Sequence, residues 1–354
     1  MRAIIYIMSL IIFSSVSAHA LDIGGITVNG EAAFDYNFLS GKDNTIPFTG
    51  AAENDTYRLN ITQILLKKET DQVSFLSRLV YNPTTYSNTA LADSKSNFGT
   101  LDQVEVFYKV LPSLHIGFGR FLTTMGYESL LKSENAFYGN SIAYQAIVPG
   151  YGEGLRAKYI AGEWLTATVS TYNQSTYNAF GDDYKPTKTT EVSATGLLGP
   201  VTWFAGYFFG KDGKLPANRA ENTASSVWAS YKIIDDLLVA VTYDSRTRTP
   251  DTGVAGWSDS TSAIITYKLW MNNFGVRYEM VRGAMHLAEG GTNVYGSADK
   301  VDSLTLTDKI ALNDNFKVYA EYRADHADQK SFKDDGGNST EYSNIFTLGA
   351  VASF

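Results

Sequence analysis

Charged side chains occupy alternate positions in many segments of this chain, a spacing that would gather them on one face of a β-sheet. In residues 315–325, Lys317, Glu321 and Arg323 alternate with apolar side chains, and successive side chains of a strand point to opposite faces. Charges gathered in this way around water can tune the passage of ions. This spacing selects the candidate lining residues Glu31, Asp35, Arg58, Arg78, Glu105, Lys109, Arg156, Lys158, Glu191, Lys232, Asp244, Arg246, Lys268, Arg277, Glu279, Lys317, Glu321 and Arg323.

The set of candidate lining residues carries an excess of positive charge. Basic residues outnumber acidic ones, whereas the intervening loops are acidic. A wall of cations facing loop carboxylates would set up a transverse field and favour a mild preference for anions. For any single residue of the set, the simpler interpretation is an ordinary solvated side chain.

Other kinds of chemistry have little support. The chain has no Cys, and His115, His286 and His326 lie far apart in the sequence, which argues against thiol catalysis, a metal centre and a Ser–His pair. We therefore expect no enzyme activity and no cofactor. Residues 181–183 and 333–338 could offer oxygen ligands to Ca²⁺, although solvated loops are the simpler interpretation. The net charge of −8 argues against nucleic acid as a partner.

A long polar segment, residues 123–150, is the second candidate for function, because a connection of this length usually has a role of its own. Two interpretations stay open: a loop folded into a barrel to constrict it, or an exposed outer loop with a short helix near residues 127–134. The constriction candidates are Tyr127, Glu128, Lys132, Glu134 and Tyr138.

The elements that would position these residues are strands of about ten to thirteen residues. They alternate in polarity, are rich in Tyr, Phe, Val, Ile and Thr, and are separated by turn residues. We predict sixteen, near residues 26–39, 57–68, 72–82, 100–110, 114–122, 151–160, 164–173, 188–198, 201–210, 224–233, 237–246, 258–269, 273–282, 299–311, 315–326 and 342–354.

Short and long connections alternate between these strands without exception. A soluble sandwich has no reason to follow that rule, whereas an outer-membrane barrel has short periplasmic turns and long extracellular loops. Alternating polarity alone would also fit a soluble barrel. Strand lengths that suit a bilayer, aromatic residues at the outward strand ends and the lack of a covering helix favour the membrane. The predicted fold class is an all-β, transmembrane antiparallel β-barrel.

The two ends of the chain agree with export to that membrane. Residues 1–20 have Arg2, an apolar run and Ala18–His19–Ala20, the pattern of a signal peptide cleaved after Ala20. Residues 21–354 would form the barrel, with no room for a plug before the first strand. At the other end, Phe346, Leu348 and Phe354 share one face of the last strand, which must pair with the first strand to close the sheet.

Two stretches carry a resemblance to known proteins. A last strand that ends in Phe resembles the signal read by the outer-membrane assembly machinery, so Phe346, Leu348 and Phe354 become the candidate assembly signal. Residues 114–129, which contain Gly119–Arg120–Phe121 and Gly126–Tyr127–Glu128, and residues 135–159, with Gly150, Gly152 and Gly154, resemble the OmpL-like group of β-barrel porins.

The resemblance implies a Gram-negative outer-membrane porin, without enzymatic activity, that passes small hydrophilic solutes and ions. It also makes a homotrimer plausible, in contact with outer-membrane lipid and lipopolysaccharide. Two alternatives remain. One is a channel selective for sugars or organic acids, guided by aromatic residues such as Phe204, Trp228 and Tyr319. The other is a structural or adhesive barrel that does not conduct.

Overall fold

The computed structural model describes residues 21–40, 56–81, 100–173, 188–212, 220–251, 255–283, 298–334 and 336–354. Residues 1–20, the expected signal peptide, lie outside this part of the chain.

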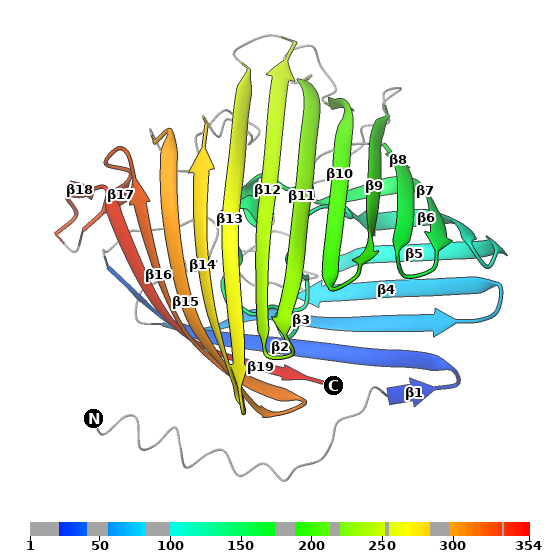
Figure 1. Ribbon diagram of the computed structural model, residues 1–354, viewed down its shortest axis with the longest axis horizontal. Coiled ribbons are helices and arrows are strands. Elements are labelled where there is room, and N and C mark those ends of the chain that lie inside the picture. The colour runs from blue at the N-terminus through cyan, green and yellow to red at the C-terminus, as the bar shows by residue number, and fades with distance from the viewer. Residues whose placement is uncertain are drawn as a thin grey trace.

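The described residues form a closed antiparallel barrel (Figure 1). Its strands are β2 (Ile26–Leu39), β3 (Thr56–Glu69), β4 (Val73–Tyr81), β5 (Thr100–Leu111), β6 (Leu114–Leu122), β7 (Tyr151–Ala161), β8 (Leu165–Tyr172), β9 (Thr189–Leu198), β10 (Val201–Asp212), β11 (Ala220–Ile234), β12 (Leu237–Pro250), β13 (Gly256–Leu269), β14 (Asn272–Arg282), β15 (Lys300–Asn313), β16 (Phe316–Ala327) and β19 (Tyr342–Ser353).

Each barrel strand pairs with the next along the chain, and the last pairs with the first. The seventeen-stranded sheet includes β1 (Leu21–Ile23), which pairs with the start of β2, and the other sixteen strands form the ring. This confirms the predicted all-β barrel of about sixteen strands. In Figure 1 the short turn between β11 and β12 lies at the same end of the barrel as the C-terminus. Closure leaves no unpaired edge, as a sheet in hydrocarbon requires.

The two faces of the barrel wall differ in chemistry. Phe34 and Val276 point outward, with 51% and 42% of their surface exposed, whereas Glu31 and Arg277 face inward and are 2% and 1% exposed. The outer surface also exposes many other Phe, Tyr, Val, Leu and Ile side chains. A soluble barrel would show the reverse arrangement. Apolar residues outside and charged residues inside are the pattern of a barrel surrounded by lipid.

Glycines allow β6 to lie close to β5, and β7 to lie close to β8, within the stretch that carried the family resemblance. Gly119 of β6 is paired with Gly154 of β7. Gly119 has φ +148°, and a Cβ atom there would lie 2.0 Å from the carbonyl oxygen of Val104. A Cβ atom on Gly154 would lie 1.8 Å from the carbonyl oxygen of Thr171. Only glycine lets the backbones approach so closely.

We therefore expect Gly119→Ala to prevent correct pairing of β5, β6 and β7 and to reduce the yield of folded barrel at least severalfold. Heat-modifiable mobility on a gel after refolding measures that yield. Gly199, at a turn with φ +61° and open space around it, provides the control. Its change to Asn, which tolerates a left-handed backbone, should leave the yield near wild type. Normal folding of Gly119→Ala would contradict this account.

The last strand closes the barrel through its final residue. The main chains of Phe354 and Gly30 exchange two hydrogen bonds of 2.9 Å. The Phe354 ring covers Gly30 so closely that a Cβ atom there would lie 2.3 Å from it. Phe346 and Leu348 lie on the same outward face of β19 and are 39% and 40% exposed. The three side chains thus form an apolar row on the outside of the closing strand.

Outside the barrel wall the described residues form few regular elements. The helix α3 (Ile142–Ala146) lies within the segment between β6 and β7, and β17 (Phe332–Lys333) pairs with β18 (Ser339–Thr340). The helix expected near residues 127–134 as part of the exposed-loop alternative is wrong, because that stretch forms turns and bends. Among the described residues, no helix is long and apolar enough to cross a membrane.

Candidate functional site

Residues 123–150 leave the end of β6, the fifth strand of the ring, and fold against the inner face of the wall. Figure 1 shows this teal segment behind β11–β13. Its contacts reach strands that lie far apart around the ring, including Glu31 on β2 and Glu191 on β9. The segment is therefore an inner layer within the barrel, and we call it the inner loop.

Wall glutamates hold the inner loop by its main chain. The two carboxylate oxygens of Glu279 accept the N–H groups of Ile142 (2.9 Å) and Ala143 (2.8 Å). Those of Glu321 accept the N–H groups of Tyr138 and Gly139, both at 2.8 Å. Each carboxylate therefore binds two successive N–H groups, and hydrogen bonds to a charged acceptor are about twice as strong as neutral ones.

Two more wall glutamates complete this arrangement. Glu31 accepts the N–H groups of Lys132 (2.9 Å) and Ser133 (2.8 Å). Glu191 accepts the N–H group of Thr124 at 2.8 Å, together with the hydroxyls of Thr123 and Thr124. All four glutamates are at most 4% exposed. We call Glu31, Glu191, Glu279 and Glu321 the clamp glutamates.

The clamp glutamates change the interpretation of the lining set. The sequence places Glu31, Glu279 and Glu321 on the inner face, where the structure also has them. Their carboxylates nevertheless face the main chain of the inner loop and are buried beneath it. The expectation that they line open water is wrong, because the inner loop covers them. Their negative charge therefore strengthens the hydrogen bonds to the inner loop.

Lysine ammonium groups donate hydrogen bonds to the carbonyl groups of the inner loop. The Nζ atom of Lys309 on β15 donates to the carbonyl oxygens of Ser133 and Asn135, both at 2.8 Å. The Nζ atom of Lys132, within the loop, donates to the carbonyl oxygen of Tyr138 at 2.7 Å. Lys309 was missed by the sequence reasoning, although its odd-numbered position in β15 puts it on the inner face with Thr305 and Thr307.

A buried ion pair fixes the middle of the inner loop. Arg277 donates through Nη1 to Oε1 of Glu128 at 2.5 Å and through Nη2 to the carbonyl oxygen of Gly139 at 3.1 Å. Glu128 also accepts the N–H group of Ser141. Burial raises the pKa of Glu128, and the charge of Arg277 opposes that rise. The guanidinium group further lies 4.7 Å from the ring centre of Phe137.

Removing Arg277 should destabilise the barrel markedly. In Arg277→Ala, Glu128 would stay buried without its charged partner, a loss that costs about 3–5 kcal/mol in other proteins. Urea unfolding of the refolded barrel, followed by tryptophan fluorescence, measures the free energy of unfolding. Lys268→Ala, at an exposed position, is the matched control and should change it by less than about 1 kcal/mol. Equal stabilities for the two variants would contradict the role of this pair.

Aromatic residues pack the start of the inner loop onto the wall. Tyr127 contacts Trp228 edge-to-face at 5.3 Å between ring centres, and Trp228 stacks on Phe204 at 5.7 Å. Trp228 also donates to the carbonyl oxygen of Gly126. Phe204 is 3% exposed and Tyr319 is fully buried. The expectation that these two rings guide a passing solute is therefore wrong, because the inner loop covers both.

The other predicted lining residues on the β2–β7 side form short networks. Arg58 donates to both carboxylate oxygens of Asp35, which also accepts the hydroxyl of Tyr138. Arg78 pairs with Asp102 at 2.7 Å, and Tyr151 donates to the same carboxylate. Arg156 lies 3.9 Å from Glu105. Lys158 lies over the ring of Phe107, at 4.2 Å.

Other candidates lie on β12 and β16 and within the inner loop. Arg323 pairs with Asp325 at 2.8 Å and is buried. Lys317 and Arg246 are partly exposed on the inner faces of β16 and β12. Within the inner loop, Glu134 accepts the hydroxyl of Ser129 at 2.5 Å. The proposed roles of these residues in conduction stay predictions.

Comparisons with known proteins agree with this architecture. The family described as "Putative beta-barrel porin-2, OmpL-like" matches residues 25–354. No curated protein matches the sequence.

Solved structures of other outer-membrane barrels are similar in fold. An anion-selective porin from Comamonas acidovorans has a TM-score of 0.66 at 10% identity, over 93% of this chain and 99% of the other. The in-vitro folded OmpT of Vibrio cholerae, in a trimer form, has a TM-score of 0.62 at 16% identity, over 94% and 100%. The outer-membrane channel DcaP of Acinetobacter baumannii has 0.59 at 15% identity, over 95% and 100%.

Proposed function

The chain belongs to the putative beta-barrel porin-2, OmpL-like family of outer-membrane porins, and from that premise we propose that it is a passive channel constricted by its inner loop. Small hydrophilic solutes and ions would cross it down their gradients. The observation that carries the proposal is the set of clamp glutamates, which binds residues 123–150 to the inner wall. A loop held in this way narrows the barrel without any moving part.

The charges left facing the lumen support a mild preference for anions. The clamp glutamates are covered by the inner loop, whereas Lys158, Arg246 and Lys317 are partly exposed on the inner wall. Cations that face water attract anions into a narrow passage. The anion selectivity of the Comamonas porin belongs to that protein; the proposal for this chain rests on its own charges.

Single-channel conductance of the refolded protein, residues 21–354, in a planar bilayer tests the proposal. We expect discrete steps of conductance that scale with salt concentration. Under a tenfold KCl gradient, the reversal potential should have the sign of chloride preference. A barrel that inserts without conducting would overturn the proposal and favour a structural or adhesive barrel. Saturable block by one sugar or organic acid would instead indicate a substrate-selective channel.

The proposed anion preference should weaken at alkaline pH. Desolvation lowers the pKa of the Lys132 ammonium from its usual value, although nearby carboxylates oppose the shift. Lys132 should therefore lose its proton at a lower pH than an exposed lysine, removing a positive charge from the constriction. The reversal potential should move toward zero as pH rises from 7 to 10. In Lys132→Met this movement should be smaller; an identical pH profile in both proteins would contradict the assignment.

The proposal extends to assembly. We propose a homotrimer in contact with outer-membrane lipid and lipopolysaccharide, since the fold also occurs in a trimer form of OmpT from Vibrio cholerae. We also propose that residues 1–20 are cleaved on export and that the chain has no enzyme activity. Mass measurement of the native protein in mild detergent tests the trimer, and its N-terminal sequence tests the cleavage after Ala20.

A further inference from the structure

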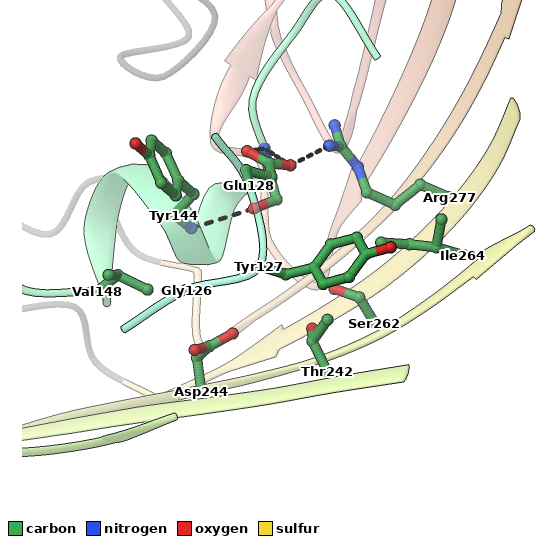
Figure 2. Close-up of a pocket in the computed structure, with 11 residues that line it drawn as sticks. Gly126, Tyr127, Glu128, Tyr144, Val148, Thr242, Asp244, Ser262, Ile264 and Arg277 are labelled. Atoms are coloured by element: carbon green, nitrogen blue, oxygen red, sulfur yellow. Dashed lines mark hydrogen bonds and ion pairs between the residues drawn. The ribbon is translucent and has the colours of Figure 1, made fainter. Parts of the chain in front are cut away.

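A small polar pocket lies between the inner loop and the wall on the β12–β14 side. Figure 2 shows Thr242 and Asp244 rising from β12 toward the loop, with Ser262 beside them on β13. Gly126, Tyr127 and Glu128 cover the pocket from the loop side. Its space is about that of one water molecule. The clamp glutamates do not line this pocket.

One carboxylate oxygen in this pocket lacks a partner. Asp244 is only 4% exposed, and its Oδ1 atom makes no hydrogen bond within the part of the chain that the structure describes. A buried carboxylate oxygen without a partner is costly and rare in proteins. The clamp glutamates and Glu128, by contrast, accept main-chain N–H groups of the inner loop. Asp244 therefore has one buried oxygen that could accept a ligand.

The surroundings of Asp244 are rich in hydroxyl oxygens. Ser226 on β11 and Ser260 on β13 are its direct cross-strand partners. Thr242 and Ser262, also paired with each other across β12 and β13, line the pocket next to it. Ser260 donates to the carboxylate of Glu279, so its hydroxyl is already used. Thr242 and Ser262 leave two hydroxyl oxygens close to the carboxylate.

The charge of the pocket favours a cation. Its lining contains two carboxylates, Asp244 and Glu128, and one guanidinium group, that of Arg277. Arg277 is turned to Glu128 and to the carbonyl oxygen of Gly139. When Asp244 is ionised, the pocket thus holds one more negative charge than positive charge, and that excess belongs to Asp244. Burial strengthens its attraction for a small cation.

We propose that Asp244, with the hydroxyls of Thr242 and Ser262, forms a subsite for a small monovalent cation. The ligand would be either an alkali metal ion or the primary ammonium group of a passing solute, which share charge, size and a preference for oxygen partners. A divalent ion fits less well, because it requires several carboxylates or carbonyls. The described residues contain no cluster of three acidic or histidine side chains suited to a metal. Binding is accordingly weak and exchangeable.

The proposal uses the proposed channel only as the route by which the cation enters, so its test is designed to work without conduction. The purified barrel in detergent is placed in N-methylglucamine chloride, whose bulky cation is too large for the pocket. Sodium or methylammonium then replaces N-methylglucamine at constant ionic strength. The readout is the midpoint of thermal unfolding, because a ligand that binds the folded state raises it.

We expect a saturable rise of the midpoint in the wild type and at least roughly tenfold weaker half-saturation in Asp244→Asn, which keeps the shape of the side chain and removes its charge. Asp259→Asn is the matched control. It removes the same charge from β13 but on the outward face, since its neighbours Ser258 and Ser260 are buried inside, and it should respond as the wild type does.

The two probes separate the sources of the cation. A response to sodium alone assigns the subsite to metal ions, and a response to methylammonium alone assigns it to amine-bearing solutes. A response to both supports a general cation subsite. Equal responses of wild type and Asp244→Asn, or no saturable response to either probe, would overturn the proposal.

If Asp244→Asn fails to fold, Ser262→Ala removes one hydroxyl ligand and serves in its place. It should weaken half-saturation by severalfold. An unchanged half-saturation in that variant would also overturn the proposal. A folded barrel that binds cations in this assay but never conducts would refute the proposed channel and leave the subsite intact.

Discussion

Replacing Glu279 and Glu321 together by glutamine should release the middle of the inner loop and enlarge the channel. Each change replaces a carboxylate that accepts two N–H groups with an amide that has one acceptor oxygen. The amide NH₂ group would then face the second N–H. Each hydrogen bond to a charged group contributes about 1.5–3 kcal/mol. The double variant therefore loses more of the free energy that holds the loop to the wall than new contacts of the loop would restore. We expect higher single-channel conductance and a markedly noisier open state.

The control for this experiment is Glu221→Gln. Glu221 lies on β11, is exposed and does not contact the inner loop, yet the change is chemically the same. Its conductance and noise should match those of the wild type. If the double variant conducts with wild-type amplitude and noise, the clamp glutamates do not hold a constriction. In that case the Glu128–Arg277 pair and the aromatic packing would suffice to keep the inner loop in place.

Deletion of Phe354 should have the largest effect in the cell. The residue closes the barrel through two main-chain hydrogen bonds to Gly30, and its ring ends the apolar row with Phe346 and Leu348. We propose that the assembly machinery recognises this row. Deletion should then reduce the amount of folded barrel in the outer membrane by roughly tenfold or more, as measured by heat-modifiable mobility of membrane fractions. Ser353→Ala, one residue earlier, is the control and should assemble normally.

Refolding without the machinery separates recognition from stability. Two hydrogen bonds contribute about 1–3 kcal/mol, so the truncated protein should still refold into detergent micelles, with a modest loss of stability. Failure in cells combined with success in micelles supports a recognition signal. Failure in both would indicate that Phe354 is needed for closure itself. Normal assembly in cells would remove Phe354 from the proposed signal.

The barrel could be predicted from the sequence because two local patterns determine it. Alternation with period two separates Lys317, Glu321 and Arg323 from their apolar neighbours, and a lipid-facing wall converts that alternation directly into two faces. The regular alternation of short and long connections then indicates the number of strands. Neither pattern depends on contacts between distant parts of the chain, and both proved reliable.

The inner loop could be located but its contacts could not. Glu321 binds the N–H group of Tyr138 across 183 positions of sequence, and no local pattern marks a glutamate for such a partner. The lack of a local signal for long-range contacts also explains the error on Phe204 and Tyr319. Their inward orientation could be predicted, but their burial beneath the inner loop could not.

Asp102 was missed for another reason. The register shift between Arg78 and Leu79 leaves it as the extra residue of a bulge, where strict alternation fails.

The clamp glutamates bind main-chain N–H groups, and this has a consequence for how the protein can change over generations. Residues 132, 133, 138, 139, 142 and 143 are held by an atom group that every amino acid except proline possesses. Substitutions at positions 132 and 133, whose side chains are only partly buried, can therefore alter the charge or size of the constriction while the hydrogen bonds that hold it persist. Selectivity can diverge there between relatives with little cost to the scaffold, whereas proline should be resisted at all six positions.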